Sequence, residues 1–205
     1  MFKRSLVIAL LASPLLAACA SIPAPGPVSV TRYSDAGQAA RMGSGTVFVE
    51  TAPGTDLPAA ELAEAKAAVA RELARLGYTE TSRAEASTIA QVSVERFVTG
   101  ADAVRRSPVS VGVGGGTGTY GSGMGLGIGI NLGGGGPHEQ LATQMGVMLR
   151  DAQSGASYWE GRAQFTVDTR SPMAQSAPNA DAVADALFRD FPGNNGETVD
   201  VRISN

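Results

Sequence analysis

The sequence predicts an α+β domain in which two helices pack on one face of a largely antiparallel sheet. Two segments repeat apolar residues every three to four positions, as amphipathic helices do, and several others alternate apolar with polar residues, as half-buried strands do. These segments follow one another as strand, helix, strands, helix, strand. The alternation indicates a sheet that is covered on one side, because one side of each strand is apolar and the other is polar.

The first strand and the first helix are expected in the N-terminal third of the chain. Gly45–Thr51 is rich in β-branched and aromatic residues, and a Pro-Gly pair follows it, as in strands that end at a turn. The helix is expected to begin with Asp56 as a capping acid and Pro58 near its first turn, and to end at Gly77. Its apolar face is formed by Leu62, Ala65, Val69, Leu73 and Leu76.

A long strand and a β-hairpin are expected next. Residues 88–98 alternate, with Ala90, Val92, Val94 and Val98 on the apolar side. In the hairpin, the apolar positions are Met145, Val147 and Leu149 in the first strand and Trp159, Gly161, Ala163, Phe165 and Val167 in the second. Residues 151–155 are rich in turn formers and join the two strands.

The C-terminal part of the chain is expected to hold a second helix and a last strand. The helix covers about residues 179–191, with Asn179 as its cap, and Pro192 and Gly193 end it. Residues 197–203 alternate and close the sheet. We therefore expect a single α+β domain over residues 30–205.

Residues 112–136 are dominated by glycine. Leu126, Ile128, Ile130 and Leu132 alternate with glycine or asparagine, which indicates a hairpin with one aliphatic side; a mobile loop and a membrane-inserting hairpin are the alternatives. A GxGxxG match at residues 116–121 suits a nucleotide phosphate only between a strand and a helix, and here more glycine follows. We interpret residues 109–137 as a glycine-rich insertion that forms an accessory hairpin or loop.

The N-terminus has the three-part layout of a secretory signal: a basic start, a short apolar run and small residues before the single cysteine. The last four of these residues resemble the lipobox of bacterial lipoproteins, in which a lipid is attached to the cysteine sulfur and the preceding peptide is removed. They are Leu16, Ala17, Ala18 and Cys19. The resemblance implies a signal peptide over residues 1–18 and a lipid anchor on Cys19.

The residues after Cys19 bear on location. In Gram-negative lipoproteins an Asp at the next position retains the protein on the inner membrane, so by resemblance Ala20 favours the outer membrane. Pro23, Pro25 and Pro27 favour an extended spacer. Residues 19–29 are therefore expected to be a lipidated, Pro-rich tether that lifts the domain off the bilayer.

Several short motifs are together similar to the domain-of-unknown-function 4136 lipoproteins of Gram-negative bacteria. Besides the lipobox and the tether, they are ARELARLGY at residues 70–78, AEAS at residues 84–87 and LRDAQSGASYWEGRAQ at residues 149–164. The most specific part is the spacing of Asp151, Gly155, Trp159 and Gly161. The resemblance covers roughly residues 28–203. It implies a fold and a location, but no activity and no catalytic residue, and the glycine-rich stretch departs from the family pattern or elaborates it.

Few residues point to chemistry. The 19 acidic residues outnumber the 16 basic ones, which argues against nucleic acid as a partner. His138 is the only histidine, whereas a metal site needs more ligands, and no GxSxG elbow marks a nucleophilic serine. Trp159 and Phe165 share the apolar side of a strand and are expected in the core. We expect no catalytic residue, no metal site and no cofactor.

The leading hypothesis is a non-catalytic lipoprotein of the cell envelope, a binding or structural module on the periplasmic face of the outer membrane. One alternative is a subunit of an oligomeric envelope complex that uses the glycine-rich hairpin for assembly or membrane insertion, and another is a hydrolase built around His138. The expected partners are the membrane, through the lipid on Cys19, and envelope proteins or further copies of the chain. No small-molecule ligand is indicated.

Overall fold

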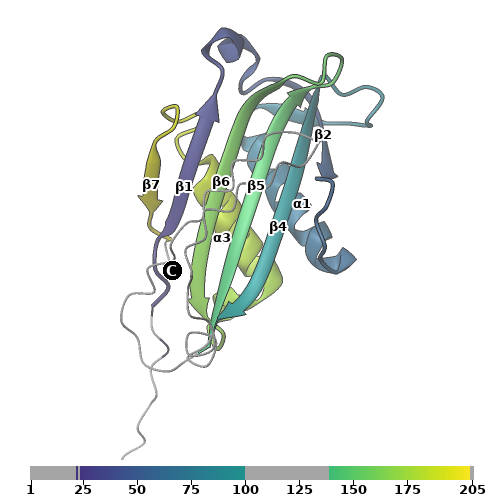
Figure 1. Cartoon of the computed structure of the whole chain (residues 1–205). Coiled ribbons are helices and arrows are strands. Elements are labelled where there is room, and N and C mark those ends of the chain that lie inside the picture. The colour runs from purple at the N-terminus through teal and green to yellow at the C-terminus, as the bar shows by residue number, and fades with distance from the viewer. Residues whose placement is uncertain (1–21, 23, 100–138, 204–205) are drawn as a thin grey trace, which may run out of the picture.

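The computed structural model describes residues 22, 24–99 and 139–203 and confirms the α+β class (Figure 1). In this part of the chain a mixed sheet of order β3-β2-β4-β5-β6-β1-β7 carries two helices. The strands are β1 (Val28–Ser34), β2 (Gly45–Thr51), β3 (Tyr78–Glu80), β4 (Thr88–Thr99), β5 (Gln140–Asp151), β6 (Ser157–Asp168) and β7 (Thr198–Val201). The helices are α1 (Ala59–Arg75) and α3 (Ser176–Phe188), with short 3₁₀ helices η1 (Ala36–Arg41) and η2 (Pro172–Ala174).

The sheet is antiparallel from β4 to β7 and parallel around β2. Strands β4, β5, β6, β1 and β7 pair as antiparallel neighbours. Strand β2 lies parallel to both β3 and β4. The parallel pair β2–β3 is possible because α1 carries the chain back to the end at which β2 begins. The alternation within each strand predicted the sheet, but not this parallel pairing.

Strand β1 was not predicted. It begins at Val28, so it includes the last two residues of the segment expected to be a tether, and it pairs with β6 on one side and β7 on the other. Val28 and Val30 are fully buried. The next residue on the same side is Arg32, so only two apolar residues mark the strand, too few for a recognisable alternation.

Arg32 is buried and holds the C-terminal end of α3. Its Nε donates to the carbonyl oxygen of Leu187 at 2.8 Å and its Nη2 to that of Ala186 at 3.0 Å. Carbonyls in the last turn of a helix have no partner within the helix, so a buried cation is a suitable donor here. Burial lowers the pKa of the Arg32 guanidinium, and Asp190 and Glu197 oppose that effect.

Both helices pack on one face of the sheet and enclose the core with it (Figure 1). On α1 the expected residues Ala65, Val69 and Leu73 are buried, together with Ala68, whereas Leu62 and Leu76 are half-buried. The expected cap by Asp56 is wrong. The helix begins at Ala59 after Pro58, and no side chain bonds its first amides.

The predicted hairpin is confirmed as β5–β6, and all the residues expected on the apolar sides of its two strands are buried. Its turn shows the role of two residues in the motif. The Asp151 carboxylate accepts bonds from the Ser154 amide (2.7 Å) and hydroxyl (2.6 Å), which hold its pKa well below the usual range. Gly155 adopts a φ of 71°, which favours glycine.

Of the other two residues of the motif, Trp159 belongs to an aromatic cluster with Phe188 of α3 and Phe191, and Gly161 lies against its ring. The Trp159 ring stacks on Phe188 at a centroid distance of 5.3 Å and lies 5.1 Å from Phe191. Its Nε1 donates to the carbonyl oxygen of Pro192 at 3.0 Å. A Cβ at Gly161 would lie 2.4 Å from the indole, so this position accommodates only glycine without a shift.

Two boundary predictions and one burial prediction are wrong. Helix α3 covers Ser176–Phe188, not residues 179–191, and Asn179 lies within it, 1% exposed, donating from Nδ2 to the Met173 carbonyl at 3.0 Å. Strand β7 is shorter than residues 197–203. Val98 is 56% exposed although its side of β4 is apolar. Arg96, one step before it on that side, already pairs with Glu61 of α1 at the edge of the helix layer.

Candidate functional site

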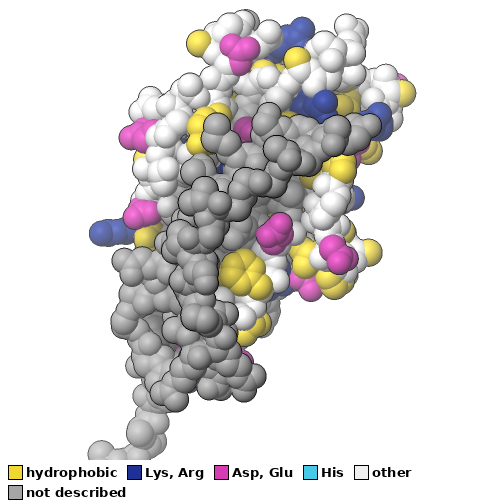
Figure 2. Space-filling model, in the orientation of Figure 1, with side chains coloured by type: hydrophobic (Ala, Val, Ile, Leu, Met, Phe, Trp, Pro, Cys, Tyr) yellow, Lys and Arg dark blue, Asp and Glu magenta, His cyan; other side chains and the backbone are white. Residues whose placement is uncertain are grey.

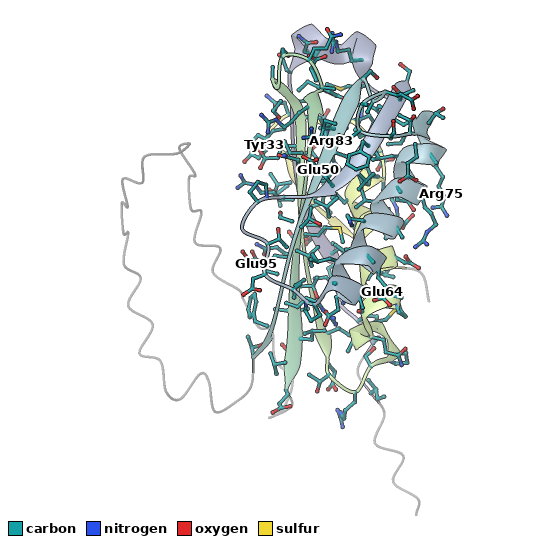
Figure 3. All side chains as sticks on the ribbon, turned by 90° about the vertical axis from the view of Figure 1, so that its right-hand side faces the viewer. Tyr33, Glu50, Glu64, Arg75, Arg83 and Glu95 are labelled. Atoms are coloured by element: carbon teal, nitrogen blue, oxygen red, sulfur yellow. The ribbon has the colours of Figure 1, made fainter. Side chains whose placement is uncertain are left out.

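The side of the sheet opposite α1 and α3, which faces the viewer in Figure 1 and Figure 2, carries no helix in the residues that the structure describes. Figure 3 shows Tyr33 and Glu95 on this side, and Glu64 and Arg75 on the side of α1. The strand register aligns its side chains in three rows across β4, β5, β6 and β1. We call these twelve residues the open face: Gln91, Met148, Glu160 and Tyr33; Ser93, Gly146, Arg162 and Thr31; Glu95, Gln144, Gln164 and Ser29.

The open face is polar, and its surface is hollowed at the centre. Together with Thr198 and the backbone of neighbouring residues, it lines a hollow of about 620 Å³. The middle row contains two small residues, Ser93 and Gly146, which are paired across β4 and β5. A Cβ at Gly146 would lie 2.6 Å from the Ser93 hydroxyl oxygen, so a larger side chain here requires that hydroxyl to rotate away.

An extended polar network borders the hollow at β2. The Glu50 carboxylate accepts a bond from Arg83 Nε at 2.9 Å and another from Gln91 Nε2 at 3.0 Å. Arg150 donates to the amide oxygen of Gln91 at 3.3 Å and to the carbonyl oxygen of Gly155 at 2.9 Å. The bond from Arg83 contributes most to lowering the pKa of Glu50. Glu50 is therefore a charged acceptor that fixes its neighbours, not a proton donor at neutral pH.

The centre of the open face offers binding groups of both kinds. Arg162 Nε donates to the Glu160 carboxylate at 2.6 Å, and this pair lies within reach of solvent, with side-chain exposures of 48% and 27%. The hydroxyls of Thr31 and Thr198 bond to each other at 2.7 Å. Amides, hydroxyls and one exposed ion pair can donate and accept hydrogen bonds over a broad surface, which suits binding.

A second polar cluster is buried near the start of β4. The Tyr158 hydroxyl lies 2.9 Å from the hydroxyl oxygen of Thr88 and 3.4 Å from that of Tyr78. Burial raises the pKa of Tyr158. Tyr158 therefore stays neutral, since a phenolate would be costly there, and its hydroxyl links β6 to β4 and β3.

The residues expected to carry function from the sequence lie outside the described part of the chain. These are Leu16, Ala17, Ala18, Cys19 and His138, together with the signal peptide and the glycine-rich residues 109–137. The open face was not predicted as a site. Its polar sides were visible strand by strand, but the order of the strands, which brings them together, was not.

Two further observations concern the described residues alone. Among them no group of three His, Cys, Asp or Glu side chains could hold a metal ion. No helix within these ranges has the length and apolar character needed to cross a membrane.

Comparison with known proteins gives only distant structural similarities. No protein-family model matches the sequence, and no curated protein matches it. A PelC dodecamer from Paraburkholderia phytofirmans is similar in two crystal forms, at 16% identity and TM-scores of 0.45 and 0.44, over 78% of this chain and 94% of that one. A PDZ domain protein from Parabacteroides distasonis is similar at 13% identity and a TM-score of 0.45, over 86% of this chain and 38% of that one. At these scores the similarities indicate nothing about function.

Proposed function

We propose that this chain is a lipid-anchored module of the bacterial cell envelope that acts by binding through its open face and not by catalysis. The anchor rests on the sequence, in which the only cysteine completes the lipobox-like Leu16-Ala17-Ala18-Cys19 after a signal-like segment. The periplasmic face of the outer membrane is the proposed location, because Ala20 and not Asp follows the cysteine.

The open face is the observation that carries the binding function. A sheet whose apolar side is covered by two helices needs nothing on its polar side for stability. Here the polar side has a hollow lined by three glutamines, several hydroxyls and the Glu160–Arg162 pair. Bonds within the Glu50 network also hold Gln91 in place before a partner arrives, which lowers the entropic cost of binding. The chemistry of the face suits a polar partner.

The anchor predicts the outcome of metabolic labelling. With a fatty-acid analogue, the wild-type chain should be labelled and sediment with membranes, whereas Cys19→Ser should be unlabelled and absent from the lipid-modified fraction. More than one acyl chain is required for stable anchoring, so loss of the acceptor sulfur should remove both label and membrane retention. Ser21→Ala is the control and should behave as wild type. Equal labelling of wild type and Cys19→Ser would show that Cys19 is not the acceptor.

The open face predicts where a partner is contacted. A photoreactive amino acid placed at Gln164 should give a discrete crosslinked product in intact envelopes, and the same residue placed at Arg75 should not. Gln164 lies on the open face and Arg75 on the opposite side, on α1 (Figure 3). Adding Arg162→Glu to the chain that carries the photoreactive residue reverses the charge at the centre of the face. This change should reduce the amount of the Gln164 crosslinked product. Crosslinking at Arg75 alone would assign binding to the helices.

A further inference from the structure

Two of the exposed large hydrophobic side chains are neighbours at the end of strand β4. The large hydrophobic residues with substantial exposure are Ile22 (43%), Tyr33 (38%), Phe97 (36%) and Val98 (56%). Tyr33 belongs to the open face, and Ile22 lies in the segment before β1. Phe97 and Val98 are consecutive and point to opposite sides of β4 just before it ends at Thr99. Two such residues at a strand end lose contact with water only if another surface covers them.

The segment before β1 reaches the sheet at this same end. Ser29 aligns with Gln164, which aligns with Gln144 and then with Glu95. Val28 therefore lies between the levels of Glu95 and Phe97, and β1 runs away from that end.

The tether limits how far this end can lie from an anchored lipid. Val28 follows Cys19 by nine positions. An extended chain covers at most ~3.6 Å per residue, so the span is about 32 Å at most, and prolines favour extension without lengthening it. If Cys19 carries the lipid, the end that holds Phe97 and Val98 faces the bilayer within this distance.

We propose that Phe97 and Val98 form a membrane-contact surface that inserts into the interface of the bilayer that holds the lipid. The inference rests on the proposed anchor at Cys19. An aromatic ring beside an aliphatic side chain is suited to the boundary between headgroups and acyl chains. The nearby Glu95 and Glu139 are acidic, which disfavours attraction to anionic lipids. The contact is therefore apolar and should be insensitive to salt.

The test uses the full mature lipidated chain in vesicles of phosphatidylethanolamine and phosphatidylglycerol. Because Cys19 is acylated, Val98→Cys supplies one free thiol for an environment-sensitive fluorophore, and Arg75→Cys on α1 supplies the matched control. Lipids with quenchers in their acyl chains should quench the label at position 98 at least twofold more than the label at position 75. Raising the salt concentration should leave the difference unchanged.

Flotation of the same samples separates the two proposals. Chains that float with vesicles while both labels stay unquenched would keep the anchor and overturn the membrane-contact surface. Chains that do not float would overturn the anchor and this inference with it. A label at position 98 that is already blue-shifted without vesicles would show that protein covers it, as would a concentration-dependent mass that Phe97→Ser abolishes, and either result would overturn the proposal.

A second experiment measures how much Phe97 and Val98 contribute to vesicle binding when the lipid anchor is absent. The Cys19→Ser chain should bind the same vesicles weakly, and adding Phe97→Ser with Val98→Ser should lower its partition by about tenfold, because each buried apolar side chain contributes to transfer from water. Ala63→Ser combined with Ala67→Ser, at two exposed positions of α1, should leave the partition unchanged. Equal partition with and without Phe97 and Val98 would contradict the assignment.

Discussion

Phe165→Ala should lower the free energy of unfolding by about 3–5 kcal/mol, the range for large-to-small changes in a closed core. Phe165 is 1% exposed, and it lies near the middle of β6 on the side that α1 and α3 cover. Phe165 is paired with Thr143 of β5, and β1 pairs with β6 up to the neighbouring Gln164, so the backbone cannot collapse far into the space left behind. Urea denaturation followed by the fluorescence of the only tryptophan, Trp159, measures the change.

Thr166→Ala is the matched control for this change. It alters the next residue of the same strand, whose side chain is half-buried and points to the opposite side of the sheet. Its cost should be less than about 1 kcal/mol, as for most substitutions away from the core. Comparable losses at both positions would mean that the two sides of β6 are equally packed, contrary to the structure.

Gly161→Ala should destabilise the domain by about 3 kcal/mol, at the upper end of the range for overpacked cores. The added Cβ would lie 2.4 Å from the Trp159 ring and 2.8 Å from Leu187. The ring has no free direction in which to move. It stacks on Phe188 at 5.3 Å, and its Nε1 is bonded to the carbonyl oxygen of Pro192. The same addition should also change the emission maximum of Trp159.

Gly146→Ala is the control for this second change. Gly146 lies next to Gly161 in the sheet but faces the other side, where the added Cβ would approach only the Ser93 hydroxyl, at 2.6 Å. A hydroxyl can rotate away, and alanine costs less backbone entropy than glycine in a strand, so the net change should be within about 1 kcal/mol. A larger loss for Gly146→Ala than for Gly161→Ala would contradict the packing described around Trp159.

The elements with many regularly spaced apolar residues were predictable from the sequence. Helix α1, strand β4 and each strand of the β5–β6 hairpin contain at least three apolar residues at the regular spacing of a helix or a strand. Each of these elements occurs where it was expected. Strand β1 was missed because Arg32 occupies a core position that only the carbonyls at the end of α3 make favourable. That compensation joins residues more than 150 positions apart, so no local pattern reveals it.

The boundaries of α3 show why a capping residue can mislead. Asparagine is a common helix cap, so the sequence predicts that the helix starts at Asn179. In the structure its amide instead bonds the carbonyl of Met173, and the helix begins earlier, at Ser176. For the candidate site, the sequence indicated polar residues on each strand. Their assembly depends on β1 lying beside β6, a pairing between the two ends of the chain that only tertiary structure reveals.

The position of β1 also decides how the domain responds to mechanical load. A pull on the N-terminal segment acts on Val28 along the axis of β1. Six aligned residue pairs with β6 and four with β7 then resist sliding together, in shear, and do not open one at a time. The Arg32 side chain adds a tie from the strand to α3. Force applied through the N-terminus therefore acts on β1, and pulling this strand out of the sheet requires many hydrogen bonds to break at once.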